Sequence, residues 1–451
     1  MRTFRFSAHF RLVFAMAILF TLVFSTQITP VFAAAIVVNS NADNITGGNA
    51  LCTLREAIAN SNANGDTTGG DCIAGTGADS ISFNAPMTIT LLLGQMVILD
   101  TTAATTINGA GTVVQGNGTG NGLTRVFHIG NDAAIDTVGR TLILNGLSVR
   151  SGGGAGLSQG TASNFGGCIL VAPNSTLTVN GGTIGGTTLA TGCRATNGGG
   201  IYGDEAAIVT LDSSTIVQQG QATANGGGVY IITGTLNVIG GSCIINSRAT
   251  LSGGGVFLGD NAFLNLGDGS TTGFLIANRA AAGGGVYIDV NGGFTGNLGR
   301  IFNNISTGSD TGSGYQAVGN NFTRSCTNCC IVNNTSSTAD AIYSVYQSTQ
   351  GNDSVFNNNW WGSNWGPRII ALAGTSSDAS WGDSIGPGTG VSGQGVDVGL
   401  TDSNPAPGGQ SMPQVTSPMY LTAGPSDCSN DICTSPSSVD PSARACSATK
   451  G

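Results

Sequence analysis

Four aromatic residues stand at the same place after four glycine triplets, and they form the first candidate binding surface. They recur at intervals of 28, 27 and 30 residues, each one position after an Ile or Val. If each repeat is one coil of a solenoid, the rings stack in a column and strand alternation turns them outward. Such a strip would suit a glycan or a partner protein. A column covered by loops, or one facing the core, is the competing interpretation. The four residues are Tyr202, Tyr230, Phe257 and Tyr287.

Carboxylate side chains that could catalyse sugar cleavage or bind calcium are the second feature to consider. A glycoside hydrolase needs paired Asp or Glu side chains, and a polysaccharide lyase would need several Asp for calcium and an Arg base. Here Asp260 and Asp268 fall singly in turn-like segments, and His128 alternates within an apolar stretch, as a structural residue would. The sequence therefore predicts no catalytic residues, no metal site and no cofactor. Calcium binding at Asp260 or Asp268 stays open, and a lyase or hydrolase remains the alternative function.

Charge and export signals restrict the partners. The formal net charge is −9, and the positive charge is scattered along the chain, so we expect no nucleic-acid partner.

Residues 1–35 combine Arg2, Arg5 and Arg11 with a short apolar run and three alanines, a pattern typical of a secretory signal peptide. A retained membrane anchor is the competing interpretation; after cleavage we expect no membrane span. The protein is thus predicted to be secreted, extracellular or held at the cell surface.

Export would permit disulfide bonds, and all eleven cysteines follow the expected cleavage site. Proximity in the sequence favours Cys52 with Cys72, and Cys428 with Cys433. Other pairings stay open.

Three recurring elements predict a solenoid of stacked coils over residues 86–370. The glycine triplets supply one, apolar-polar-apolar triplets supply a second, and apolar runs that end on Asn supply the third. Apolar side chains on one face of each strand would form continuous buried columns, and stacked Asn side chains could satisfy one another. Three short strands and three turns in about 28 residues describe one coil of a parallel β-helix.

A short helix near the N-terminus is predicted to close the first coil. Thr53 and Glu56 form a capping box, and Leu54, Ala57, Ile58 and Ser61 line one face. An apolar helix face of this kind can cover the open end of a solenoid, and residues 36–85 would form the capping module.

This segment resembles a known module of exported bacterial proteins, named for its Cys-Ser-Leu-Arg-Glu-Ala motif. The motif reads Cys52-Thr53-Leu54-Arg55-Glu56-Ala57 here, with Thr53 in place of the Ser, between Ile36-Val37-Val38 and Asp79-Ser80-Ile81. The resemblance implies that right-handed parallel β-helix repeats follow. The fold class is therefore predicted to be all-β, a right-handed parallel β-helix of the pectate-lyase-like kind with a short N-terminal capping helix.

The repeats between about 165 and 335 also resemble those of polymorphic outer-membrane, adhesin-like β-helix proteins. The segment around Trp360 and Trp361 resembles the end of pectate-lyase-like helices, where large rings cap the last coil; these rings could also grip a sugar. Residues 371–404 would complete this cap, and residues 405–451, rich in Pro, Ser and Gly, are expected to form a loose tail.

The predicted function is adhesin-like binding of a polysaccharide or surface protein, or a structural role, and self-association of the rod stays open.

Overall fold

The computed structural model describes residues 33–109, 111–117, 125–131, 138–152, 165–308, 311–318, 324–332, 334–336, 342–347, 354–357, 368–371 and 397–400. The leader expected over 1–35 lies almost entirely outside these residues. So do Trp360, Trp361, Cys428 and Cys433.

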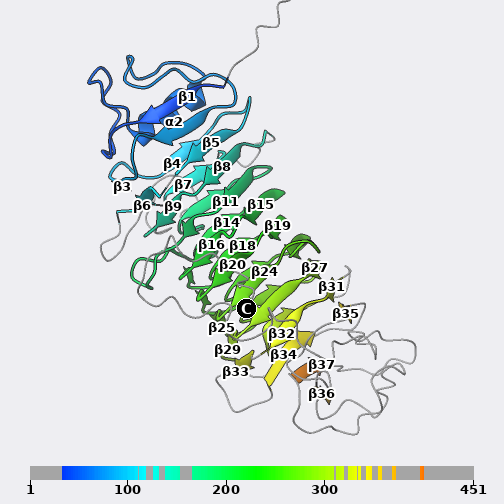
Figure 1. Cartoon of the computed structure of the whole chain (residues 1–451). Helices are drawn as coiled ribbons and strands as arrows, with labels where there is room; N and C mark the ends of the chain where they lie inside the picture. The colour runs from blue at the N-terminus through cyan, green and yellow to red at the C-terminus, as the bar shows by residue number, and fades with distance from the viewer. Residues whose placement is uncertain are drawn as a thin grey trace, which may run out of the picture.

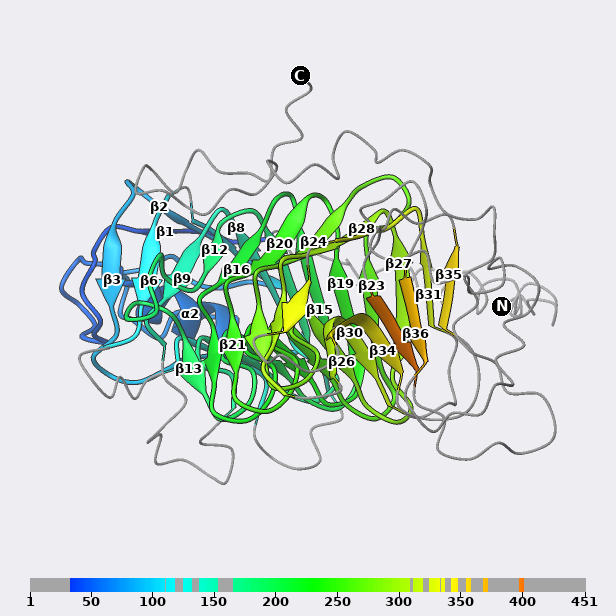
Figure 2. The ribbon, with the colours of Figure 1, turned by 90° about the horizontal axis from the view of Figure 1, so that it is seen from below.

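The chain forms a parallel β-helix, in which four sheets run along a rod and every named strand pairs in parallel with its equivalent in the next coil (Figure 1). Most complete coils visit sheets I, II, III and IV in that order. Figure 2 shows the strands side by side along the rod, from the N-terminal coils to the last ones. An all-β parallel solenoid with one helix among the described residues is thus confirmed, and right-handedness stays a prediction.

Sheet I contains β1 (Ala35–Val38), β2 (Ser80–Phe83), β5 (Thr105–Asn108), β8 (Thr141–Asn145), β11 (Thr176–Asn180), β15 (Ala207–Asp212), β19 (Gly234–Val238), β23 (Ala262–Leu266), β27 (Gly293–Asn297), β31 (Arg324–Thr327) and β35 (Ser354–Asn357). Sheet II contains β3 (Thr88–Thr90), β6 (Val113–Gln115), β9 (Ser148–Arg150), β12 (Thr183–Ile184), β16 (Ile216–Gln218), β20 (Ser242–Ile245), β24 (Gly273–Ile276), β28 (Gly299–Phe302) and β32 (Cys330–Val332).

Sheet III contains the short strands β13 (Arg194–Ala195), β17 (Gln221–Ala222), β21 (Arg248–Ala249), β25 (Arg279–Ala280), β29 (Ile305–Ser306) and β33 (Thr335–Ser336). Sheet IV contains, in spatial order, β4 (Met96–Ile98), β7 (Phe127–Ile129), β10 (Ile169–Val171), β14 (Ile201–Gly203), β18 (Val229–Ile231), β22 (Val256–Leu258), β26 (Val286–Ile288), β30 (Thr311–Ala317), β34 (Ile342–Gln347), β37 (Asp397–Leu400) and β36 (Arg368–Ala371).

Alternation along the strands fills the interior with aliphatic columns. In sheet I, Leu177, Val209, Leu236 and Leu264 follow one another in register and are fully buried. Sheets II and IV contribute equivalent columns to the same core. Each rung therefore buries the surface that the previous rung leaves open, so no single coil can be stable alone.

The coil has one strand more than the three expected. A fourth, two-residue strand forms sheet III, because the chain turns sharply after sheet II and returns to extended backbone for two residues, which are Arg-Ala or Gln-Ala in the first four of these strands. Gln219, Asn246, Ala277 and Asn303 make this turn with φ of 53–54°. Asn tolerates that left-handed conformation better than most residues, which explains its frequency there.

A buried asparagine ladder follows this turn. Asn278 donates from Nδ2 to Oδ1 of Asn304 at 3.1 Å, and Asn304 donates to Oδ1 of Asn334 at 2.9 Å. The same amides also donate to carbonyls of the strand before, including Leu275 from Asn304. A predicted ladder of stacked Asn is therefore present, but Asn246 is not part of it. Ser247 holds the equivalent position, since its N–H donates to Asn278 Oδ1 at 3.0 Å.

The N-terminal helix α2 (Leu54–Ala63) has the predicted capping box and covers the first coils. The Thr53 side chain accepts from the Glu56 N–H, and the Glu56 side chain accepts from the Thr53 N–H. The predicted apolar face of Leu54, Ala57 and Ile58 is buried. Strands β1 and β2 of the expected capping module form the first rungs of sheet I and pair in parallel.

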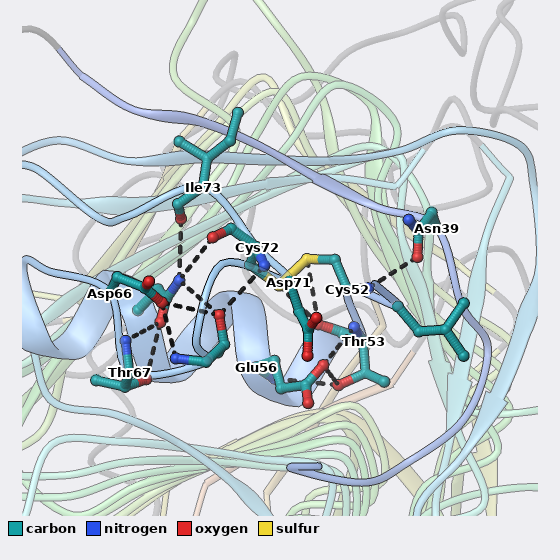
Figure 3. The surroundings of a disulfide bond; sticks show 12 residues. Asn39, Cys52, Thr53, Glu56, Asp66, Thr67, Asp71, Cys72 and Ile73 are labelled. Carbon is teal, nitrogen blue, oxygen red and sulfur yellow. Dashed lines mark hydrogen bonds between the residues drawn. A yellow bond between two sulfur atoms is a disulfide. The ribbon is translucent and has the colours of Figure 1, made fainter. Parts of the chain in front are cut away.

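The predicted disulfide bond between Cys52 and Cys72 is present and ties the loop after α2 to the start of the helix (Figure 3). Asn60, inside the helix, fastens the same loop from the other side. Its Nδ2 donates to the carbonyl of Ile73 at 3.0 Å, and its Oδ1 accepts from the Thr67 N–H at 2.7 Å. The cap is therefore held by a covalent bond and by hydrogen bonds of the buried Asn60 side chain.

Side chains of the cap satisfy backbone groups at the start of sheet IV. The Asn62 amide donates to the Val97 carbonyl at 2.8 Å and accepts from the Leu99 N–H at 2.7 Å, as a neighbouring strand would. Arg55, paired with Asp43 at 2.6 Å, donates to the carbonyls of Gly94 and Gln95. Arg55 of the Cys52–Ala57 motif thus helps to close the end of the rod, where an unpaired strand could otherwise pair with a strand of another molecule.

We predict that Asn304→Ala destabilises the rod by several kcal/mol, because each buried partner left unsatisfied costs about 1–3 kcal/mol. Asn265→Ala is the matched control. Asn265 is half-buried on the outside of sheet I and donates to Asn237 Oδ1 at 2.8 Å, where water can replace it. Denaturant unfolding followed by circular dichroism measures both, and equal losses would contradict the structural role of the buried ladder.

We predict that Asn62→Leu exposes the first strand of sheet IV and produces self-association at the N-terminal end. The loss of two backbone partners should also lower the free energy of unfolding by about 1–3 kcal/mol. Asn44→Leu, which changes a cap-loop amide that bonds only locally to Thr46, serves as control. Sedimentation velocity at increasing concentration is the measurement. A monomeric Asn62→Leu variant of unchanged stability would show that the amide does not protect the edge.

Candidate functional site

The four aromatic residues predicted to form a strip do stack in one column. Tyr202, Tyr230, Phe257 and Tyr287 occupy the central positions of β14, β18, β22 and β26, in register. Neighbouring ring centroids are 5.1, 4.7 and 5.2 Å apart, and the planes are within 10° of parallel. The Ile, Val and Leu residues beside the rings point into the core. We call this column the aromatic ladder.

A fifth ring extends the aromatic ladder at its N-terminal end. The position equivalent to Tyr202 in the coil before is Leu170, which carries no ring. Phe165, from the turn ahead of that strand, instead stacks on Tyr202 with centroids 4.6 Å apart. The triplet-plus-ring pattern did not identify Phe165, because its ring enters the column from a different position of the repeat.

Because the rings lie face to face, the ladder offers ring edges rather than ring faces. Tyr202 is 4% exposed and Phe257 is 7% exposed, whereas Tyr230 and Tyr287 are half-buried. A sugar cannot stack flat on a ring face that another ring already covers. The groups that this ladder can offer a ligand are therefore the phenol hydroxyls and the ring edges.

The glycine triplets allow the turn before each ring to pack closely against the aromatic ladder. Gly226, the first glycine of its triplet, has φ of +66°, and a Cβ on it would lie 2.7 Å from the Cβ of Tyr230. Gly227, the second, has no room either, since a Cβ there would lie 2.3 Å from the Gly254 carbonyl oxygen of the next coil. Only glycine lets the turn lie against the base of the ring while the coils keep their spacing.

Burial and nearby carboxylates keep the tyrosines protonated. The pKa of Tyr202 is raised mainly by burial and further by Asp204, Tyr230 and Glu205. The pKa of Tyr230 and that of Tyr287 are also raised, first by burial and then by acidic groups that include Asp289. At neutral pH the phenols are therefore hydrogen-bond donors, next to carboxylates that accept.

A column of arginines runs along sheet III. Arg194, Gln221, Arg248 and Arg279 succeed one another in register, and the three arginines are exposed. The positive charge, expected to be scattered, is therefore gathered in part along one line, which corrects that expectation. The missed signal is an Arg-Ala or Gln-Ala dipeptide four or five residues before each triplet. We call Arg194, Arg248 and Arg279 the arginine column.

The other predicted residues take structural positions. The Asp268 carboxylate accepts from the Thr271 and Ser270 N–H groups at 2.6 and 2.8 Å, and these bonds lower its pKa. Asp260 is exposed, next to Asn261 in a turn. His128 is buried, with Nδ1 3.1 Å from Gln95 Nε2. Among the described residues, no group of three or more His, Cys, Asp or Glu is placed to hold a metal ion.

Two further disulfide bonds were not predicted. Cys168 is joined to Cys193, which lies 25 residues later, and Cys326 is joined to Cys329. The solenoid brings them together, because Cys168 precedes β10 of sheet IV and Cys193 precedes β13 of sheet III in the next coil.

Comparison with known protein families, with curated proteins and with solved structures gave no match to this chain. In the described part of the chain, no helix has the length and apolar character needed to cross a membrane.

We predict that the ladder tyrosines ionise at higher pH than free tyrosine. Because their folded pKa lies above the unfolded value of about 10, their stabilising contribution is complete below pH 10 and is lost as pH rises through the folded pKa. Phenolate absorbance measures the titration. Tyr202→Phe should remove a late component, and Asp204→Asn should move that component to lower pH. Ordinary titration of all seven tyrosines would contradict the burial of the ladder.

Proposed function

We propose that the protein is an exported, adhesin-like rod that binds a carboxylate-bearing polysaccharide along sheets III and IV. This proposal rests mainly on one observation. The arginine column and the aromatic ladder follow the same coils with the same rung spacing. A repeating polymer matches a repeating surface, since each bound unit brings the next one close to an equivalent site.

The arginine column supplies the charge for this ligand. Arg248 and Arg279 are adjacent in register, about 4.8 Å apart along the rod. Like charges held this close repel each other in the free protein, and an anionic ligand relieves that repulsion. Guanidinium groups also hold carboxylates through paired hydrogen bonds. A protein of net charge −9 with exposed arginines gathered in one line is therefore suited to an anion at that line.

The aromatic ladder supplies hydrogen bonds for the sugar hydroxyls. The hydroxyl groups of Tyr202, Tyr230 and Tyr287 are donors at neutral pH, and Asp204 and Asp289 are acceptors beside them. In each coil the turn that ends on the glycine triplet separates this set from the arginine. The carboxylates of the ligand would thus meet the arginines on one side of the turn, and its hydroxyl groups would meet the tyrosines and the two aspartates on the other.

Three observations support an extracellular location. The first 35 residues have the composition of a secretory signal peptide. The described body contains buried disulfide bonds, which persist in oxidising compartments outside the cytosol. The resemblance of the Cys52–Ala57 motif to the module of exported β-helix proteins supports the same location.

We predict that the mature protein is retained by polygalacturonate in affinity electrophoresis, and less by neutral dextran. Arg248→Gln with Arg279→Gln should weaken retention about tenfold, and added salt should weaken it further. Tyr230→Phe with Tyr287→Phe removes two hydroxyls but keeps the stacked rings, and should weaken retention by a smaller factor. Arg150→Gln, which removes one positive charge from sheet II where Arg150 donates to Gln115 Oε1, is the control for Arg248→Gln alone.

The same incubations, with and without calcium, are assayed for new reducing ends and for unsaturated products. Retention of an uncleaved polymer that depends on Arg248 and Arg279 supports the proposal. Cleavage would establish the lyase or hydrolase alternative instead. Equal retention of the acidic and neutral polymers, or an Arg150→Gln effect as large as that of Arg248→Gln alone, would contradict the role of the arginine column.

A further inference from the structure

The outer face of sheet II is apolar and buried, although it points away from the core. Phe274, Ile276 and Phe302 are 3, 2 and 6% exposed. With Ile245, Val332 and two cysteines they form a cluster separate from the main core. Residues on the outer face of a strand cannot reach this burial through their neighbours in the same sheet alone, so a covering layer lies over them.

The described members of this cluster all belong to sheet II or to the turn after it. Only Ile216 and Ala277 pack against it from the partly buried described residues. Sheets I, III and IV wind around the core behind sheet II and cannot cover its outer face. The covering layer therefore comes from a segment outside the coils.

Two cysteines in this face identify the segment. Cys243, Phe274, Arg300 and Cys330 succeed one another in register. Both cysteines are disulfide-bonded. They are three rungs apart, about 14 Å at about 4.8 Å per rung. Because a disulfide needs Cα atoms within about 7 Å, they cannot be bonded to each other.

Elimination leaves few partners for these two cysteines. The other described cysteines are joined among themselves, as Cys52–Cys72, Cys168–Cys193 and Cys326–Cys329. The sequence contains three more, all near its end: Cys428, Cys433 and Cys446. We propose that the C-terminal segment 405–451 lies along the outer face of sheet II and is fastened there by disulfide bonds from two of these cysteines to Cys243 and Cys330.

The C-terminal segment is long enough to reach this face and carries apolar residues that fit it. Strand β37 ends at Leu400, and the 28 residues to Cys428 can span far more than the few rungs involved. The five-residue step from Cys428 to Cys433 spans about 17 Å when extended, enough to follow the separation of Cys243 and Cys330. The segment also offers apolar side chains for the cluster, in Met419-Tyr420-Leu421 and Ile432.

Arg300 adds electrostatic support. Its side chain stands between Phe274 and Cys330 in the same column and is 2% exposed, with Nη1 donating to the carbonyls of Gly299 and Asn328. A buried guanidinium favours an acidic neighbour. Asp427 and Asp431 stand next to Cys428 and near Cys433, so fastening the segment would bring carboxylates to this arginine.

Each bond forms as two thiols lose two protons and two electrons, which pass to the disulfide of an oxidoreductase in the compartment of export. This proposal does not rest on the proposed polysaccharide binding. It replaces the loose tail expected from composition, and it is incompatible with a Cys428–Cys433 bond, which would leave one tail cysteine for two partners.

The test is disulfide mapping by mass spectrometry of the exported full-length protein, digested without reduction. We expect the peptides containing Cys243 and Cys330 each to be linked to a peptide with Cys428, Cys433 or Cys446. A Cys428–Cys433 link, or either body cysteine found as a free thiol or joined elsewhere, would overturn the proposal.

A second measurement follows the surface itself. Cys243→Ser with Cys330→Ser should release the segment, so that protease cuts within 405–451 and a dye for apolar surfaces gains fluorescence several-fold. Cys168→Ser with Cys193→Ser, which removes a disulfide bond elsewhere in the rod, should leave both readouts near those of the parent protein. A double variant at Cys243 and Cys330 that resembles this control would also count against the segment as the cover.

Discussion

The in-register stacking of parallel strands is the constraint on which the rest of this structure depends. Every residue meets its equivalent in the next coil at one fixed spacing. A residue type is therefore tolerated at a position only if it can pack on a copy of itself or on a close substitute. Leu and Val do so in the core, Asn through amide hydrogen bonds and Tyr through stacked rings. Glycine occupies turns where even a Cβ would press the coils apart.

This constraint also explains how far the sequence could predict the structure. The repeats predicted the parallel β-helix, the columns in the core and the stacked rings, because each follows from one residue type at one position. The capping box of α2 was predictable because it is local. The fourth sheet was missed because a two-residue strand has no periodicity to detect. Ser247 was missed because its place in the Asn ladder shows only when the coils are aligned by their buried residues.

The candidate site was predictable in part for a related reason. The aromatic ladder repeats without interruption, so its residues could be named from the sequence, whereas Gln221 interrupts the arginine column. Phe165 escaped because its ring reaches the ladder from another position in the coil. The orientation of the rings required the structure: parallel planes leave edges and hydroxyls outward, which changes the kind of contact that a ligand can make.

The N-terminal cap gives the rod a direction. Asn62 and Arg55 occupy the backbone groups that one more coil would use at that end, so the array cannot be lengthened there without dismantling the cap. The coils from β13 to β26 are interchangeable in outline, since each contributes one turn, one ring position and one position of the line formed by the arginines and Gln221. A gene duplication of a single coil would thus lengthen the exposed columns by one step while the closed end stays unchanged. In such a protein, length is a property that evolution can alter in whole units.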